Sequence, residues 1–157
     1  MEAVKVPVVA GGGISDARGL VAALALGAEG VLMGTRFMAS RECQVHPNIR
    51  KWLLGLTEAD TMVILRSIKV ANRVVKNSQT EKIRELEQKG ATLEELLPLI
   101  SGRIGEQAYQ VGNIDNAMIS VGQGIGLIHD IPGVKEIIDG IISESEGVMR
   151  RLGSIGL

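Results

Sequence analysis

Two short apolar runs near the N-terminus predict buried strands. Residues 6–10 (VPVVA) and 30–33 (GVLM) lack the alternation of a half-exposed strand, so each favours a strand of a parallel sheet that is covered on both faces. Between them, Ser15 or Asp16 can cap a helix that runs to about Leu26. The resulting strand–helix–strand connection is long enough for the two strands to be parallel neighbours, which predicts a βαβ unit.

The pattern downstream is mainly helical. Pro47 suits the first turn of a short helix, and the charged residues 78–89 predict a solvent-exposed one. Thr92 and Glu95 have the spacing of a capping box ahead of the apolar LEELLPLI. The apolar residues 60–65 predict either a short strand or a buried loop.

The C-terminal third predicts two further helices. Residues 118–128 (MISVGQGIGLI) are apolar and punctuated by glycine, and we expect a helix whose glycines serve packing, with Gln123 as a polar contact to a cofactor or to backbone. After Pro132, apolar residues recur at three- and four-residue intervals and form one stripe on a long helix that needs a surface to cover. The stripe comprises Val134, Ile137, Ile138, Ile141, Ile142, Val148, Met149 and Leu152.

Composition limits the classes of protein that fit these elements. The chain has 157 residues, 45% of them hydrophobic, with one Phe, one Trp and one Tyr, so the core is aliphatic. The chain has 17 basic and 18 acidic residues, and this net charge of −1 indicates neither a basic surface that would bind nucleic acid nor a basic amphipathic surface that would bind a membrane. The single Cys43 is typical of a reducing compartment, and neither a membrane span nor a signal peptide is evident, so a cytoplasmic location is expected.

Two glycine-bearing loops carry the clearest chemical signal. GGGIS follows the first predicted strand and MGTRF follows the second, and in a parallel sheet both loops leave the same edge. The backbone N–H groups of Gly12, Gly13, Gly34 and Thr35 can then converge on one anion, and Arg36 can add charge. The positive N-terminal end of the intervening helix would add to this site. The alternative is that the glycines only form turns.

Other candidate residues point to no second site. His46 and His129 have no partner at metal-ligand spacing, so no metal site is predicted and each histidine is assigned local hydrogen bonds. Cys43 has no paired base that would make it a nucleophile. The catalytic residues are therefore left unassigned.

The stretch PVVAGGGISDARGLVAALALGAEGVLMGTRF resembles the seventh strand, seventh helix and eighth strand of nitronate monooxygenase (2-nitropropane dioxygenase) barrels. It is equally similar to the flavin-dependent enoyl-acyl-carrier-protein reductase that shares their fold. CQVHPNIRKW, RVVKN and SVGQGIGLIHDIPGVKEII are also similar to that group. The resemblance implies an α/β fold that is the C-terminal part of a (β/α)8 TIM barrel, strands 7 and 8, followed by a mainly helical C-terminal region.

The resemblance also implies a division of the chain and a cofactor. Residues 1–42 would be the phosphate-binding unit, residues 43–131 a mainly helical insertion or cap, and residues 132–157 the C-terminal helix. FMN would bind with its phosphate on Gly12, Gly13, Gly34 and Thr35, with Gly11 and Met33 close by.

The activity implied is oxidation of a small-molecule alkyl nitronate with O2, and the alternative is reduction of an enoyl thioester. About six preceding βα units, including the family's catalytic histidine, are absent, so we expect the N-terminal half or a homo-oligomer to complete the barrel. A third possibility is a non-catalytic flavin- or phosphate-binding module that needs a partner chain.

Overall fold

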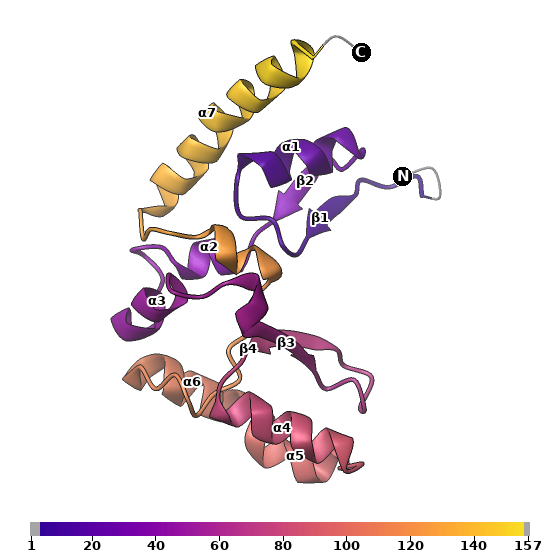
Figure 1. The fold of residues 1–157 in the computed structure, drawn as a ribbon, viewed down its shortest axis with the longest axis vertical. Helices are drawn as coiled ribbons and strands as arrows, with labels where there is room; N and C mark the ends of the chain where they lie inside the picture. The colour runs from indigo at the N-terminus through magenta and orange to yellow at the C-terminus, as the bar shows by residue number, and fades with distance from the viewer. Residues whose placement is uncertain (1–3, 156–157) are drawn as a thin grey trace.

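A computed structural model describes residues 4–155, and its first unit is the predicted βαβ (Figure 1). β1 (Val9–Gly11) and β2 (Gly30–Leu32) are parallel, and the register pairs Gly11 with Leu32. α1 (Ala17–Ala25) connects the strands and is capped by Asp16, whose side chain accepts a hydrogen bond from the Gly19 amide. The predicted strand–helix–strand order and the cap are confirmed.

The middle of the chain contains a small antiparallel sheet as well as helices. α2 (Thr35–Met38), α3 (Pro47–Leu53) and the 3-10 helix η1 (Glu58–Asp60) lead into a hairpin of β3 (Thr61–Ile64) and β4 (Asn72–Val75). The apolar run after Asp60 is therefore a strand, which resolves the alternative left open by the sequence. Lys69 and Leu65 in the connecting turn both have a φ of +62°, in the left-handed region.

Residues 118–128 do not form the predicted helix. Ser120 forms an isolated antiparallel bridge with Val74 of β4, and the Val121 amide donates to the Arg73 carbonyl at 3.1 Å, so the start of this stretch runs extended beside the two-stranded sheet. It continues as the 3-10 helix η2 (Gln123–Leu127). The prediction was wrong because unpaired backbone groups of β4 offer hydrogen bonds that a local apolar pattern does not reveal.

Three consecutive helices cover the hairpin end of the molecule: α4 (Ser78–Gln88), α5 (Leu93–Ile100) and α6 (Gly102–Val111). The predicted capping box of Thr92 and Glu95 is present at the start of α5. Two aliphatic clusters form the core, one centred on α3 and the 117–128 stretch, the other between the hairpin and α4–α5. Figure 1 shows these helices at the opposite end of the molecule from the βαβ unit.

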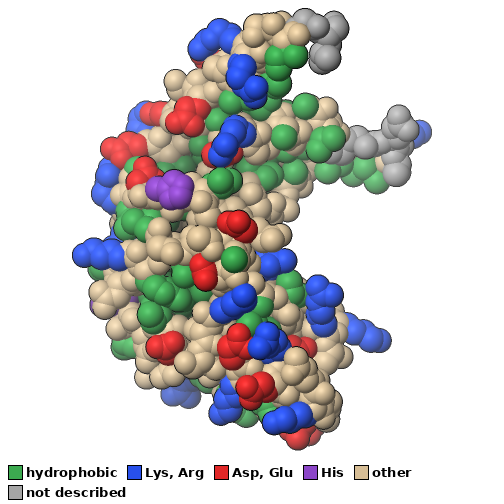
Figure 2. All heavy atoms as spheres, in the orientation of Figure 1, with side chains coloured by type: hydrophobic (Ala, Val, Ile, Leu, Met, Phe, Trp, Pro, Cys, Tyr) green, Lys and Arg blue, Asp and Glu red, His purple; other side chains and the backbone are tan. Residues whose placement is uncertain are grey.

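The C-terminal helix α7 (Val134–Gly153) packs against α1. Ile137 and Ile141 of its apolar stripe are buried, whereas Ile142 and Met149 remain 54% and 53% exposed. The stripe is thus only partly covered, and Figure 2 shows apolar side chains on the surface at this end. Across residues 4–155, no helix has the length and apolarity needed to cross a membrane.

Candidate functional site

The two glycine turns, residues 12–13 and 33–34, emerge side by side. Because Gly11 pairs with Leu32, each turn begins directly after its strand at the same edge of the parallel pair. Gly12 and Gly13 have φ values of +99° and +74°, which a residue with a side chain adopts only with strain. The local sequence GGG therefore fixes the shape of the first turn.

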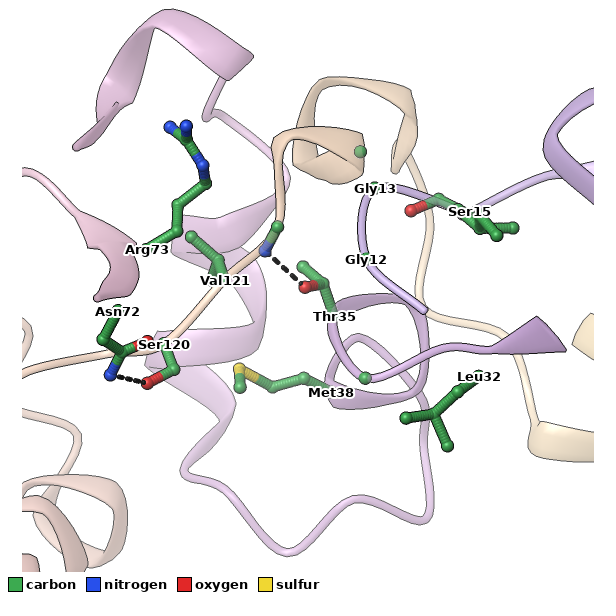
Figure 3. A pocket seen from close by; sticks show the side chains of 14 residues that line it. Gly12, Gly13, Ser15, Leu32, Thr35, Met38, Asn72, Arg73, Ser120 and Val121 are labelled. Carbon is green, nitrogen blue, oxygen red and sulfur yellow. Dashed lines mark hydrogen bonds between the residues drawn. The ribbon is translucent and has the colours of Figure 1, made fainter. Parts of the chain in front are cut away.

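A third segment, distant in sequence, closes over these turns. The Gly122 amide donates a hydrogen bond to Thr35 Oγ1 at 2.9 Å (Figure 3). A Cβ on Gly122 would lie 3.1 Å from the Gly13 nitrogen, and a Cβ on Gly124 would lie 2.6 Å from the Gly13 carbonyl oxygen. A side chain at position 124 would overlap the Gly13 carbonyl, so glycine is required there, whereas the contact at position 122 is tight but less restrictive.

The three segments surround a cavity of about 630 Å³. This volume lies within the range of ordinary small-molecule sites, roughly 300–1,000 Å³. Besides the glycines of these segments, the lining includes apolar Leu32, Met38 and Val121 and, at the edge formed by β4, Asn72 and Arg73. The complete lining is Gly12, Gly13, Ile14, Ser15, Leu32, Gly34, Thr35, Met38, Asn72, Arg73, Ser120, Val121, Gly122 and Gly124.

The residues predicted to hold a phosphate divide into two groups. Gly12, Gly13, Gly34 and Thr35 all border this cavity. Gly11 lies within β1, and Met33 is a half-buried residue directly after β2. The structure thus brings together the four residues predicted to contact the phosphate, whereas Gly11 lies in a strand and Met33 lies next to one.

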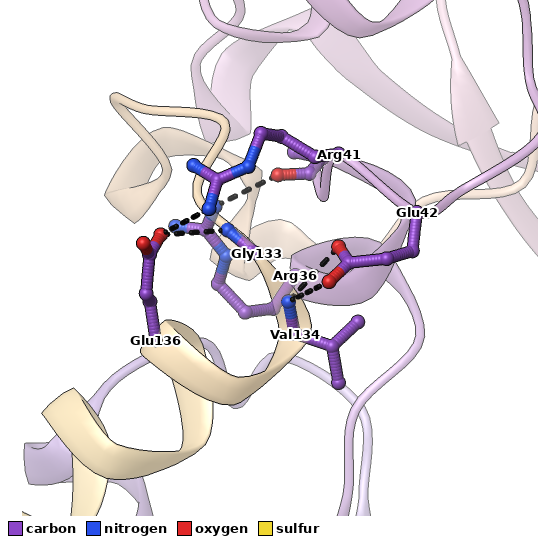
Figure 4. Close-up of polar contacts among 7 residues, drawn as sticks. Arg36, Arg41, Glu42, Gly133, Val134 and Glu136 are labelled. Carbon is purple, nitrogen blue, oxygen red and sulfur yellow. Dashed lines mark hydrogen bonds and ion pairs between the residues drawn. The ribbon is translucent and has the colours of Figure 1, made fainter.

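Arg36 does not supply charge to this cavity. Its side chain is 7% exposed and is turned toward Asp130, with Nη1 donating to Asp130 Oδ1 at 2.9 Å and Nη2 donating to the Asp130 carbonyl at 2.8 Å. The neighbouring Arg41–Glu136 pair also ties the α2 region to the start of α7 (Figure 4). The hypothesis that Arg36 charges the anion site is wrong, because a buried guanidinium needs a fixed acceptor and Asp130 provides it.

The N-terminus of α1 is also less positive than expected. Burial opposes ionisation of Asp16, but hydrogen bonds from the Gly19 amide and from Arg18 outweigh it and lower the pKa of this carboxyl below its ordinary value. The carboxylate therefore places a negative charge on the first turn of α1, which reduces the attraction of this helix end for another anion.

The remaining candidates lie outside the cavity. His46 caps α3, with its Nδ1 accepting from the Asn48 amide at 3.2 Å, as expected for a residue at the start of a helix, and His129 is exposed. Cys43 is partly buried, and Tyr109 lies near it; burial, with a smaller effect of Cys43, raises the pKa of Tyr109. Within residues 4–155, no three His, Cys, Asp or Glu side chains are grouped as they would be around a metal ion.

Sequence reasoning missed Arg73 and the part played by Gly122 and Gly124. A glycine at every second position of GQGIG was the available signal, because such spacing suits an extended segment that approaches another backbone closely. Arg73 carried no signal, since only the pairing of β4 with residues 119–121 brings it to the cavity.

Comparison with known proteins identifies the group to which this architecture belongs. The family model described as nitronate monooxygenase matches residues 1–144. A probable nitronate monooxygenase from Bacillus subtilis is 33% identical over 149 residues, covering 91% of this chain and 41% of that protein. FabK from Thermotoga maritima superposes with a TM-score of 0.88 at 37% identity, covering 98% of this chain and 49% of that one.

A third relative has another activity in its name. (3aS,4S,5R,7aS)-5-hydroxy-7a-methyl-1-oxo-octahydro-1H-indene-4-carboxyl-CoA dehydrogenase from Rhodococcus jostii is 29% identical and aligns with 99% of this chain and 54% of its own length. The chain thus spans about half the length of the relatives it matches. Its parallel strand pair and following helices are the C-terminal part of a (β/α)8 barrel, as the resemblance predicted. The chain belongs to the nitronate monooxygenase family of oxidoreductases.

Proposed function

We propose that the chain carries the FMN-phosphate-binding end of an oxidoreductase of the nitronate monooxygenase type. The observation that carries this proposal is the meeting of Gly12, Gly13, Gly34 and Thr35 around one cavity. A Cβ built on any of the three glycines would meet no atom within 4 Å, so there is open space beside each backbone. A phosphoryl group can approach main-chain amides closely in such a space, and the residues present therefore fit the phosphate of FMN.

Each part of the site has a role in this proposal. Gly12, Gly13, Gly34 and Thr35 hold the phosphate, with Gly11 at the end of β1 and Met33 directly after β2 close by. Because Thr35 Oγ1 already accepts a hydrogen bond from Gly122, its own hydroxyl proton is left to donate to a phosphoryl oxygen. Bound FMN would supply the redox chemistry by which an alkyl nitronate is oxidised with O2.

The division of the chain follows from these roles, also as a proposal. Residues 1–42 form the phosphate-binding unit, residues 43–131 the cap, and residues 132–157 the covering helix. The first unit is completed by Gly122 and Gly124 from the cap, since both lie against Gly13.

Completion of the barrel belongs to the same proposal. Val9 and Leu32 of the parallel strands are 59% and 70% exposed, which is unusual for strands of a closed barrel. The N-terminal half of the barrel, or another copy of the chain, would cover these faces and contribute the catalytic base. We assign no catalytic base among residues 4–155.

A second candidate function is reduction of an enoyl thioester with a nicotinamide cofactor. The similarity to FabK from Thermotoga maritima, which covers 98% of this chain at 37% identity, favours it. The two activities require different substrates and can be separated directly. The chain, combined with the N-terminal half of the barrel, is assayed for O2 consumption with a nitronate and for NADH oxidation with an enoyl thioester. Turnover of the nitronate alone supports the first function, and turnover of the thioester alone supports the second.

Flavin binding is tested with the chain itself. FMN is titrated while flavin fluorescence is followed, and Gly34→Ala is compared with Gly105→Ala. Neither added methyl group meets an atom within 4 Å, so both variants should keep the fold, but only Gly34 lines the cavity. We expect Gly34→Ala to weaken FMN binding by about tenfold or more and Gly105→Ala to leave it unchanged. Equal affinities in both variants would count against the site.

A further inference from the structure

The cavity has two chemically different ends. At one end lie the glycine turns, whose lining residues carry no formal charge. At the other end, residues of β4 and the neighbouring stretch contribute Asn72, Arg73 and Ser120. Arg73 is the one charged side chain among the described residues that line the cavity.

Arg73 is held firmly by its backbone and more loosely by its side chain. It lies in β4 opposite Val63 of β3, and its carbonyl accepts from the Val121 amide. Its Nη1 donates to Thr61 Oγ1 at 2.8 Å, which uses one of several N–H donors on a neutral hydroxyl. The strand therefore fixes the origin of the side chain while most of the guanidinium remains available.

The charge of Arg73 is not neutralised by the chain. Arg36 and Arg41, which lie outside the cavity, each pair with a carboxylate, Asp130 and Glu136 respectively. No carboxylate of residues 4–155 forms an ion pair with Arg73. Arg73 is half-buried, lines the cavity and has no counter-ion among the described residues, and such an arginine is suited to bind an oxyanion through parallel N–H donors.

The position of Arg73 separates it from the glycine turns. In Figure 3 its guanidinium lies on the far side of Val121 from Gly12 and Gly13. A single phosphoryl group gripped by the turns would leave Arg73 for another negative charge. We propose that Arg73 forms a second anion subsite, and that the substrate of this protein carries a carboxylate or phosphate group that binds there. This inference deepens the proposed function by naming an anionic substrate.

Nitrogen-15 NMR of the 16.7 kDa chain tests the subsite directly. Inorganic phosphate and acetate are titrated separately while the Nε–H signal of Arg73 and the backbone amides of Gly13 and Gly34 are followed. We expect phosphate to shift the Arg73 signal with a midpoint different from that of the two glycine amides, and the Arg73 shift to persist when the chain is saturated with FMN. A response to acetate as well indicates a carboxylate-bearing substrate, and a response to phosphate alone indicates a phosphorylated one.

Variants separate the subsite from the fold. The Nε–H signal of Arg73 is lost when this residue is replaced, so in the variants the subsite is followed through the backbone amides of Asn72 and Val74 in β4. Arg73→Gln should weaken the anion response of these amides by about tenfold or more and leave the glycine amides responsive, whereas Arg66→Gln, an exposed arginine of the same hairpin, should change neither. The dispersion of the amide spectrum reports whether each variant is folded. Arg73→Lys keeps the positive charge but loses the parallel N–H donors of the guanidinium, so it should retain part of the affinity for the anion.

Two results would overturn the inference: an Arg73 signal that responds to neither probe, or one that titrates together with Gly13 and Gly34, which would make Arg73 part of a single phosphate site. If the proposed FMN-phosphate site is wrong, the glycine amides will not respond to FMN, which is a different result from either of these two. The response of Arg73 to inorganic phosphate is read independently of that outcome.

Discussion

Gly124→Ala should disrupt the site by separating the η2 segment from the first glycine turn. A Cβ at this position would lie 2.5 Å from Ser15 Oγ and 2.6 Å from the Gly13 carbonyl oxygen. The serine hydroxyl can rotate away, but the carbonyl belongs to a backbone turn with a φ of +74° and cannot. The two segments must therefore move apart, and the hydrogen bond from Gly122 to Thr35 should lengthen or break.

The expected magnitude follows from the size of this overlap. Inserting a methyl group into a packed contact costs about 1–3 kcal/mol when backbone must shift. For a chain of this length each kcal/mol lowers the melting temperature by roughly 2–4 °C. FMN affinity should fall by about tenfold or more, because Gly13 and Thr35 would no longer face one phosphoryl group. Circular dichroism melting and flavin fluorescence titration measure the two effects.

Two controls isolate the backbone contact. Gly105→Ala adds the same methyl group in open space within α6 and should stabilise the helix by up to about 1 kcal/mol. The double variant Ser15→Ala with Gly124→Ala removes the hydroxyl but not the carbonyl, and it should remain impaired. If Gly124→Ala melts and binds FMN like the wild type, or if the double variant recovers fully, the reasoning about this contact is refuted.

Three further predictions address features outside the cavity. Arg36→Gln should lower the free energy of unfolding by about 1–3 kcal/mol but leave FMN affinity within about twofold, since Arg36 is bonded away from the cavity; a large loss of affinity without a loss of stability would contradict this. Burial opposes ionisation of Glu87, but hydrogen bonds from Ser67 and Leu65 lower its pKa below the ordinary value. A lowered pKa stabilises the fold at pH values above the unfolded-state pKa, and this stabilisation is lost as pH falls through the folded-state pKa. In denaturant unfolding, the free energy of unfolding of the wild type should therefore exceed that of Glu87→Gln by roughly 1 kcal/mol at neutral pH, and the difference should vanish in acid. A difference that grows in acid would be inconsistent with this prediction. Ile142→Lys should reduce self-association of the isolated chain in sedimentation experiments, because it breaks the exposed part of the α7 stripe, and unchanged association would assign the contact to another surface.

Local signals in the sequence were sufficient for the elements that position the first part of the site. The paired glycines, the Asp16 cap and the crossover length predicted the βαβ unit and the neighbouring turns. The capping box at Thr92 and the helix after Pro47 were likewise predicted, because helix ends are encoded within a few residues.

The parts that the sequence did not predict depend on contacts between distant segments. Residues 118–128 have an apolar pattern compatible with a helix, and only the free edge of β4 makes them extended. Arg36 follows the second glycine turn directly, so proximity suggested a role there, but a partner 94 residues away determines its direction. Arg73 was overlooked for the same reason, since no local pattern connects it to the turns.

Amide NMR during flavin titration tests most directly whether the two adjacent glycine turns bind one phosphoryl group. Adding FMN to the nitrogen-15-labelled chain should shift the amides of Gly12, Gly13, Gly34 and Thr35 with a common midpoint, whereas riboflavin, which lacks the phosphate, should leave them nearly unchanged. Shifts confined to one turn, or equal shifts with riboflavin, would contradict a phosphate site shared by the two turns.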